Sequence, residues 1–141
     1  MAGLVLQGRM LVEGTAVAPI HLLKAPLSLW GGLDPETGKI IDQRHPNVGE
    51  IVTGKVMTLT AGRGSSSASS ILLEAVRQKK GPAAIILAEM DGILTLGAAV
   101  AKEMYDDAPP VVVLNKADFD LLTHNTMVAI ESNGLIRTID N

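Results

Sequence analysis

The chain has 141 residues, 47% of them hydrophobic but only 2% aromatic, with a formal net charge of −3, so we expect one domain, residues 1–141, with an aliphatic core. The absence of cysteine excludes disulfides, thiolate metal ligands and an iron–sulfur cluster held by cysteines of this chain. No basic stripe favours nucleic acid as a partner and no apolar run is long enough to span a membrane, so a soluble, cytoplasmic protein is expected.

The first third of the chain predicts two strands and a long ordered loop. Residues 4–11 are typical of a strand, and the second strand, 13–23, contains Pro19, which favours an edge or a bulge. Residues 24–47 are rich in proline and glycine, and 34–38 have the pattern of a tight turn. Ordered loops of this length are uncommon and usually functional.

From residue 51 onward, strands and helices alternate, which predicts an α/β arrangement. The expected elements are strands 51–60, 83–88 and 111–114, helices 65–79, 93–105 and 118–124, and a final hairpin of strands 127–132 and 135–139. Asp118 is expected to cap the short helix, and Asn133-Gly134 indicates the hairpin turn.

Residues 61–70, Ala-Gly-Arg-Gly-Ser-Ser-Ser-Ala-Ser-Ser, are the most informative stretch. Small residues let backbone approach a ligand, and a helix that begins here would favour an anion. Arg63 adds a planar cation, and a serine hydroxyl could transfer a proton. The stretch matches neither a Walker A loop nor a dinucleotide fingerprint. A plain turn with a serine N-cap explains the residues equally well.

Two further segments have candidate roles. Trp30, the only tryptophan, is expected either in the core or at a partner interface, and Asp34 to shape the turn. The run 41–46, Ile-Asp-Gln-Arg-His-Pro, is interpreted as a salt-bridged surface in preference to a functional loop. His45 lacks the neighbouring ligands of a metal site.

These segments together carry a family resemblance. Residues 28–38, Ser-Leu-Trp-Gly-Gly-Leu-Asp-Pro-Glu-Thr-Gly, 42–46, Asp-Gln-Arg-His-Pro, and 62–66, Gly-Arg-Gly-Ser-Ser, resemble the small subunit of aconitase X. The resemblance covers essentially the whole chain and is most specific in 28–67. It implies an aconitase-type swivelling β/β/α domain with a mixed central sheet and flanking helices. A separate chain of this length is similar to the archaeal form, whose small and large subunits are separate polypeptides.

The resemblance implies the small subunit of a hydro-lyase that is active only with its large subunit. The implied reaction is that of a phosphomevalonate dehydratase, in which mevalonate 5-phosphate loses water to give trans-anhydromevalonate 5-phosphate. An iron–sulfur cluster on the cysteine-bearing large subunit would take the leaving hydroxyl as a Lewis acid. Bacterial relatives imply an alternative substrate, cis-3-hydroxy-L-proline. A non-catalytic module that binds a phosphorylated metabolite stays open, and the segment around Trp30 is expected to contact the large subunit.

The resemblance also implies site residues. In aconitases a Gly-x-Gly-Ser-Ser stretch presents the catalytic base, and its first serine abstracts the proton. Gly62, Gly64, Ser65 and Ser66 match that stretch residue by residue. Ser65 is therefore the expected base, and Gly64 and Ser66 are expected to bind substrate.

One departure concerns the substrate-binding arginine. Aconitases follow the serine pair with arginine and glutamate, whereas this chain has Ser67 and Ala68. The arginine cannot be carried over by position, so Arg63 is the hypothesis for binding a small anionic substrate.

Overall fold

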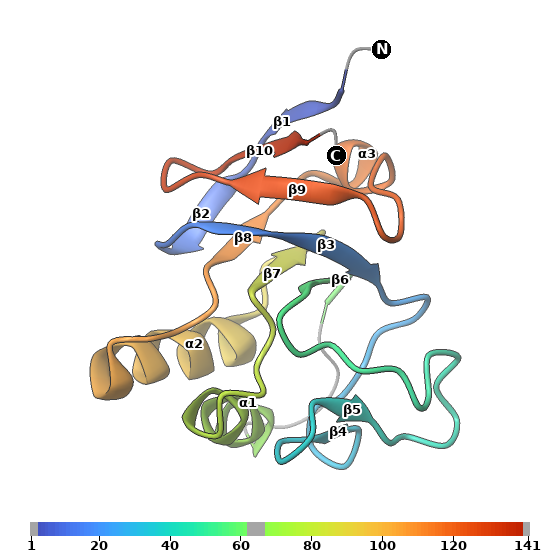
Figure 1. The fold of residues 1–141 in the computed structure, drawn as a ribbon, viewed down its shortest axis with the longest axis vertical. Coiled ribbons are helices and arrows are strands. Elements are labelled where there is room, and N and C mark those ends of the chain that lie inside the picture. The colour runs from blue at the N-terminus through green and yellow to red at the C-terminus, as the bar shows by residue number, and fades with distance from the viewer. Residues whose placement is uncertain (1–2, 62–66, 140–141) are drawn as a thin grey trace.

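The computed structural model describes residues 3–61 and 67–139, which form a curled mixed sheet, two long helices on one side and a small hairpin (Figure 1). The elements are β1 (Val5–Gln7), β2 (Arg9–Val12), β3 (Ala16–Leu22), β4 (Leu33–Asp34), β5 (Lys39–Ile40), β6 (Val56–Leu59), α1 (Ser67–Arg77), β7 (Ala84–Leu87), α2 (Gly92–Tyr105), β8 (Val111–Val113), α3 (Lys116–Phe119), β9 (Met127–Ile130) and β10 (Leu135–Thr138). None of the helices in the described ranges is long and apolar enough to cross a membrane.

The large sheet closes on itself. Its strand order is β1-β10-β9-β3-β6-β7-β8-β2, so the two edge strands are consecutive in the chain. Gly8 alone joins them, and its N–H donates to the Gly134 carbonyl at 2.9 Å. A Cβ at Gly8 would lie 2.4 Å from Val112 Cγ2, so glycine is required where the edges meet.

Pairing changes direction along β3. Its first half, Ala16 to Pro19, pairs antiparallel with β9, and its second half, from Ile20, pairs parallel with β6. Pro19 stands at the change, where its missing N–H is tolerated. β3 lies inside the sheet, between β9 and β6, and its register with them has no shift, so the expectation of an edge strand or a bulge was wrong.

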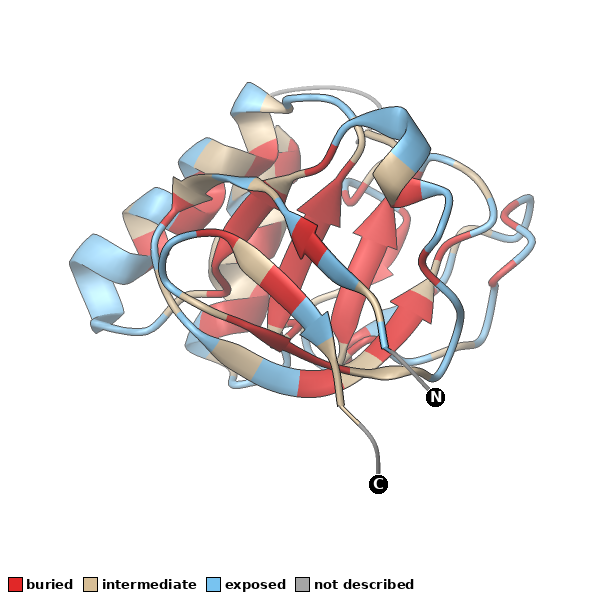
Figure 2. Ribbon diagram, turned by 90° about the horizontal axis from the view of Figure 1, so that it is seen from above, coloured by how far each residue is buried: buried red, intermediate tan, exposed pale blue. Residues whose placement is uncertain are grey.

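Two aliphatic cores result from the alternation of side chains along the parallel strands. On β7, Ala84 and Ile86 face the inside of the curled sheet, whereas Ile85 and Leu87 face the helices. All four are fully buried, as expected for a strand covered on both faces (Figure 2). The outer core lies under α1 and α2, which pack against each other through Leu72 and its neighbours.

Three predicted elements differ from the structure. The expected strand 4–11 is two strands, because Gly8 closes the sheet. The expected strand 51–60 is only β6, since residues 53–55 form a turn. The short helix is Lys116–Phe119 rather than 118–124, and its N-cap is Asn115, whose Oδ1 accepts the Asp118 N–H at 2.8 Å.

Several other expected elements are confirmed for the described residues. Helices α1 and α2 and the hairpin of β9 and β10 lie where the sequence predicts them. The loop 24–47 is ordered, and the turn at 34–38 joins β4 and β5, a small hairpin that was not expected. The fold is the predicted mixed sheet with flanking helices.

Candidate functional site

The carboxyl ends of β3, β6, β7 and β8 lie at one edge of the sheet, because these strands pair in parallel. Ligands of α/β sheets bind outside this edge. The chain leaves β6 here at Leu59 and enters α1 at Ser67. The loop after β3 starts at the same edge, where the Leu23 N–H donates to the Thr58 carbonyl at 2.9 Å.

The predicted site residues Arg63, Gly64, Ser65 and Ser66 lie outside the described residues. Their sequence position places them between the end of β6 and the start of α1. Helix α1 has no acidic residue in its first turn, so its positive end is not offset there.

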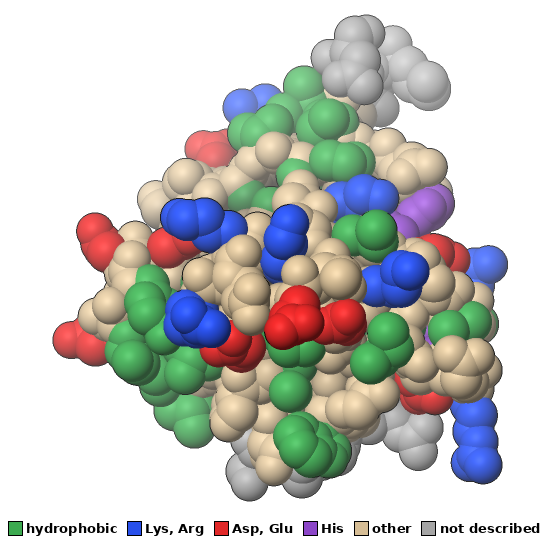
Figure 3. All heavy atoms as spheres, turned by 60° about the horizontal axis from the view of Figure 1, so that its bottom comes forward, with side chains coloured by type: hydrophobic (Ala, Val, Ile, Leu, Met, Phe, Trp, Pro, Cys, Tyr) green, Lys and Arg blue, Asp and Glu red, His purple; other side chains and the backbone are tan. Residues whose placement is uncertain are grey.

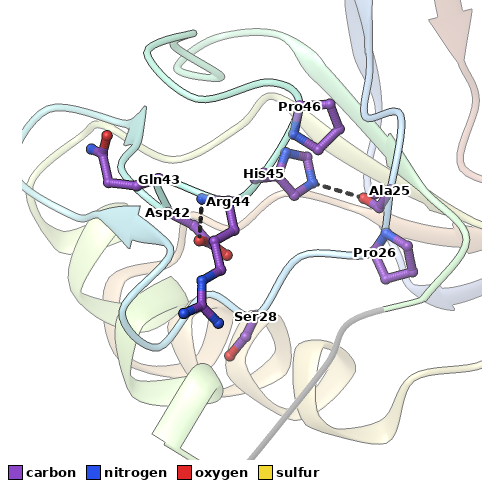
Figure 4. A pocket seen from close by; sticks show the side chains of 8 residues that line it. All are labelled: Ala25, Pro26, Ser28, Asp42, Gln43, Arg44, His45 and Pro46. Carbon is purple, nitrogen blue, oxygen red and sulfur yellow. Dashed lines mark hydrogen bonds between the residues drawn. The ribbon is translucent and has the colours of Figure 1, made fainter.

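A pocket of about 670 Å³ lies between the loop after β3 and the loop that follows β5 (Figure 4). It is lined by Ala25, Pro26, Ser28, Asp42, Gln43, Arg44, His45 and Pro46. We call it the 25–46 pocket. Residues 42–46 line this pocket. Within the described residues, no member of the 41–46 run forms a salt bridge. The interpretation of that run as a salt-bridged surface was therefore wrong.

His45 connects the two loops that form the walls of the 25–46 pocket. It is buried, its Nε2 lies 2.9 Å from the Ala25 carbonyl oxygen, and its Nδ1 accepts the Asn47 N–H at 3.0 Å. Because Nδ1 accepts, Nε2 carries the proton and donates to Ala25. The Asp42 carboxylate accepts the Arg44 N–H at 2.9 Å and shapes the turn between them.

A second polar cluster lies behind this loop, and no motif in the sequence predicts it. His21, on β3, donates from Nε2 to Glu50 Oε1 at 2.7 Å. The Asn47 side-chain amide also donates to Glu50 Oε1, at 2.9 Å, and to the Leu22 carbonyl oxygen. Its Oδ1 accepts the Lys24 N–H at 2.8 Å. Asn47 is 1% exposed, so a satisfied buried amide fixes the loop to β3.

The charges of this cluster are set by burial and hydrogen bonding. Burial lowers the pKa of His21, and its hydrogen bond to Glu50 only partly offsets this. The hydrogen bond from Asn47 is the main cause that lowers the pKa of Glu50. The pair is therefore a neutral imidazole beside a carboxylate. His21 Nδ1 is buried and has no hydrogen-bond partner within the described part of the chain.

The structure excludes one of the two interpretations of Trp30 and confirms the expected role of Asp34. Trp30 is 61% exposed, so it does not fill the core. Asp34 Oδ1 accepts the Glu36 N–H at 2.9 Å and shapes the turn between β4 and β5.

The face seen in Figure 3 has no large area of one charge. On this face Lys and Arg side chains are scattered among Asp and Glu, and hydrophobic side chains form separate clusters between them. This distribution gives no electrostatic reason for a polyanion to bind this face.

The described residues do not fit an iron–sulfur cluster. The chain has no cysteine, and residues 3–61 and 67–139 hold no group of three or more His, Asp or Glu side chains that could bind a metal ion. No chemical step is therefore assigned to a metal held by this chain.

Comparisons with known proteins agree with this fold. Over 133 residues, 94% of this chain, it is 40% identical to the cis-3-hydroxy-L-proline dehydratase of Hypocrea jecorina, but it spans only 22% of that protein. It is 36% identical over 101 residues to the phosphomevalonate dehydratase small subunit of Methanothermobacter thermautotrophicus, covering 72% of this chain and 77% of that one.

A solved structure and a family model also match this chain to aconitase X. A crystal structure of Thermococcus kodakaraensis aconitase X in its holo-form matches with a TM-score of 0.87 and 29% identity, covering 98% of this chain and 100% of that one. The model of the aconitase X swivel domain matches residues 5–138. This chain therefore belongs to the aconitase X swivel-domain family.

Proposed function

We propose that this chain is the small subunit of an aconitase X-type hydro-lyase and that Ser65 is its proton-abstracting base. The observation that carries the proposal is the family match over residues 5–138, together with the motif Gly62-x-Gly64-Ser65-Ser66 between β6 and α1. In the proposed reaction, a β-hydroxy acid loses its α-proton to Ser65 and its β-hydroxyl as water. Residues 1–141 would form one swivel-type domain.

The surroundings of the motif support a basic serine. A serine hydroxyl becomes a base only where positive potential stabilises its alkoxide. The positive end of α1 begins two residues after Ser65, and Arg63 lies two residues before it. Arg63, Gly64 and Ser66 are proposed to bind the anionic substrate beside the base.

The first candidate substrate is mevalonate 5-phosphate, which would give trans-anhydromevalonate 5-phosphate. Its support is the similarity to a phosphomevalonate dehydratase small subunit that matches over most of its own length. The product would keep the carboxylate and the phosphate, because only the α-proton and the β-hydroxyl leave.

The second candidate substrate is cis-3-hydroxy-L-proline. A specific observation favours it: the identity to a dehydratase of that compound is 40% over 133 residues, compared with 36% over 101 residues for the phosphomevalonate relative. Both candidates are β-hydroxy acids, so one base could serve either reaction.

The remaining parts of the enzyme are proposed to lie on a cysteine-bearing large subunit. The iron–sulfur cluster implied by the family would be bound there, and departure of the hydroxyl is not assigned to any residue of this chain. The exposed Trp30 is the proposed contact with that subunit. The cytoplasmic location stays a prediction.

The test is a substrate assay of the assembled complex. This chain is co-expressed with an aconitase X large subunit, and loss of water is followed for both candidate substrates. Turnover of one of them supports the hydro-lyase and identifies its substrate. Turnover of neither, with phosphate-dependent thermal stabilisation of this chain, would favour the non-catalytic module and contradict the proposal.

A further inference from the structure

The 25–46 pocket lies beside the start of α1. Ser28, on one wall, stands between Leu27 and Leu29, which are both buried in the same core cluster as Ala68 and Leu72 of α1. Ala25 and Pro26 follow directly from the carboxyl end of β3. The pocket is therefore at the edge of the sheet from which the chain leaves β6.

The walls of the pocket are held before any ligand binds. The hydrogen bond between His45 Nε2 and the Ala25 carbonyl oxygen, at 2.9 Å, joins segments 20 residues apart. The buried Asn47 holds the same loop to the end of β3 through the Lys24 N–H and the Leu22 carbonyl oxygen. A site with fixed walls loses little conformational entropy when a ligand binds.

Arg44 is the cation of this pocket, and its guanidinium has no partner in the part of the chain that the structure describes. Its side chain is exposed and extends over the pocket toward the side where Ser28 lies (Figure 4). Within residues 3–61 and 67–139, the guanidinium makes no hydrogen bond or ion pair, whereas Arg77 pairs with Glu74 and Arg137 with Glu131. The neighbouring Asp42 carboxylate is engaged by the Arg44 backbone N–H.

We propose that Arg44 binds the carboxylate of the β-hydroxy acid substrate. This inference rests on the proposed function and adds a substrate-binding residue to it. An arginine fork matches the two oxygens of a carboxylate with parallel hydrogen bonds. When the α-proton leaves, negative charge moves onto that carboxylate, so the contact strengthens toward the transition state.

Both candidate substrates carry this carboxylate. The inference therefore does not depend on which of them the enzyme takes. A volume of about 670 Å³ leaves room for the rest of either molecule.

The experiment compares binding of each acid with binding of its primary amide, in which an uncharged group of the same shape replaces the carboxylate. The complex carries Ser65→Ala so that the ligands are not consumed, and calorimetry gives the dissociation constants. Arg44→Gln is expected to weaken binding of the acid about 10- to 100-fold and of the amide less than about threefold. Arg44→Lys is expected to weaken binding of the acid by an intermediate factor, because lysine keeps the positive charge but lacks the planar fork.

Arg77→Gln is the matched control, since Arg77 lies at the far end of α1 and pairs with Glu74. It should leave both dissociation constants unchanged. The inference would be overturned if Arg44→Gln weakened binding of acid and amide equally, or weakened neither. It would also be overturned if the complex bound neither acid. Turnover is measured separately with Ser65 intact, so a complex that binds the acids through Arg44 without dehydrating them would contradict the proposed function alone.

Discussion

His21 Nε2 lies 2.7 Å from Glu50 Oε1, and this hydrogen bond joins strand β3 to the loop before β6. The imidazole is buried, whereas the carboxylate is 40% exposed and also accepts from Asn47. The pair fixes the tautomer of His21, since an ionised carboxylate can only accept. It also makes the stability of the fold depend on pH.

We expect acid to destabilise the protein through His21. Burial holds its pKa below the ordinary 6.5, so below that pH the unfolded chain takes up a proton that the folded chain does not. The free energy of unfolding should therefore fall as pH decreases through 6.5 toward the lowered pKa. The pKa of Glu50 is also lowered, from its ordinary value of 4.5. Its contribution to the free energy of unfolding is therefore lost only below pH 4.5.

The measurement is urea unfolding at about pH 7.5 and about pH 5, above and below the ordinary histidine pKa. His21→Gln keeps a donor for Glu50 but cannot titrate, so its loss of stability between the two pH values should be smaller. An equal loss in both proteins would show that His21 is not the group responsible.

Replacing Gly38 should be costly for two separable reasons. Its φ is +75°, and an added Cβ would lie 1.9 Å from Thr53 Oγ1 and 2.9 Å from the Lys80 carbonyl oxygen. Gly49 has a φ of +90° and no heavy atom within 4 Å of an added Cβ. Gly49→Ala is therefore expected to cost about 1 kcal/mol for backbone strain alone. Gly38→Ala is expected to cost about 1–3 kcal/mol more, because it also overpacks.

Thermal or urea unfolding of the two variants gives both costs directly. Equal destabilisation would mean that the loop around Gly38 relaxes to accept the methyl group. In that case the close approach of the β4–β5 turn to Thr53 and Lys80 is not rigid.

Trp30 should contribute to assembly with the large subunit. A tryptophan that is 61% exposed on a folded loop is the residue type that most often dominates an interface. Trp30→Ala is expected to weaken the complex about 30-fold or more, with the unfolding transition of this chain almost unchanged.

Met104→Ala is the control for that assembly measurement, since Met104 is 60% exposed on α2. Calorimetry of the two subunits should give the same affinity for Met104→Ala as for the unaltered chain. A loss in the Met104 variant together with no loss in the Trp30 variant would place the contact on α2 instead.

The sequence predicts the elements whose signals are local. Asn133-Gly134 specifies its hairpin because the turn needs a positive φ, which Gly134 has at 89°. The split of the first strand at Gly8 was missed, because it depends on closure of the sheet between Val112 and Gly134, more than a hundred residues away. Asn115 rather than Asp118 caps α3, since either residue type suits the position.

The candidate site also combines features that the sequence predicts with features that only the fold creates. The motif around Ser65 is recognisable because its residues are contiguous. The contact of His21 with Glu50 and Asn47 cannot be recognised from the sequence, because only the folded 24–47 loop brings these residues together. The sequence also does not predict that the Arg44 guanidinium stays without a partner, since Asp42 beside it suggests an ion pair that does not form among the described residues.

The most direct test of the proposed mechanism is the kcat of the assembled complex with Ser65→Ala, compared with Ser70→Ala. Ser70 is exposed one turn into α1 and serves as the matched serine control. Loss of the base is expected to lower kcat about 100- to 10,000-fold with assembly and substrate binding retained, whereas Ser70→Ala keeps normal turnover. A Ser65→Ala complex that turns over at nearly the normal rate would contradict the role of Ser65 as the base.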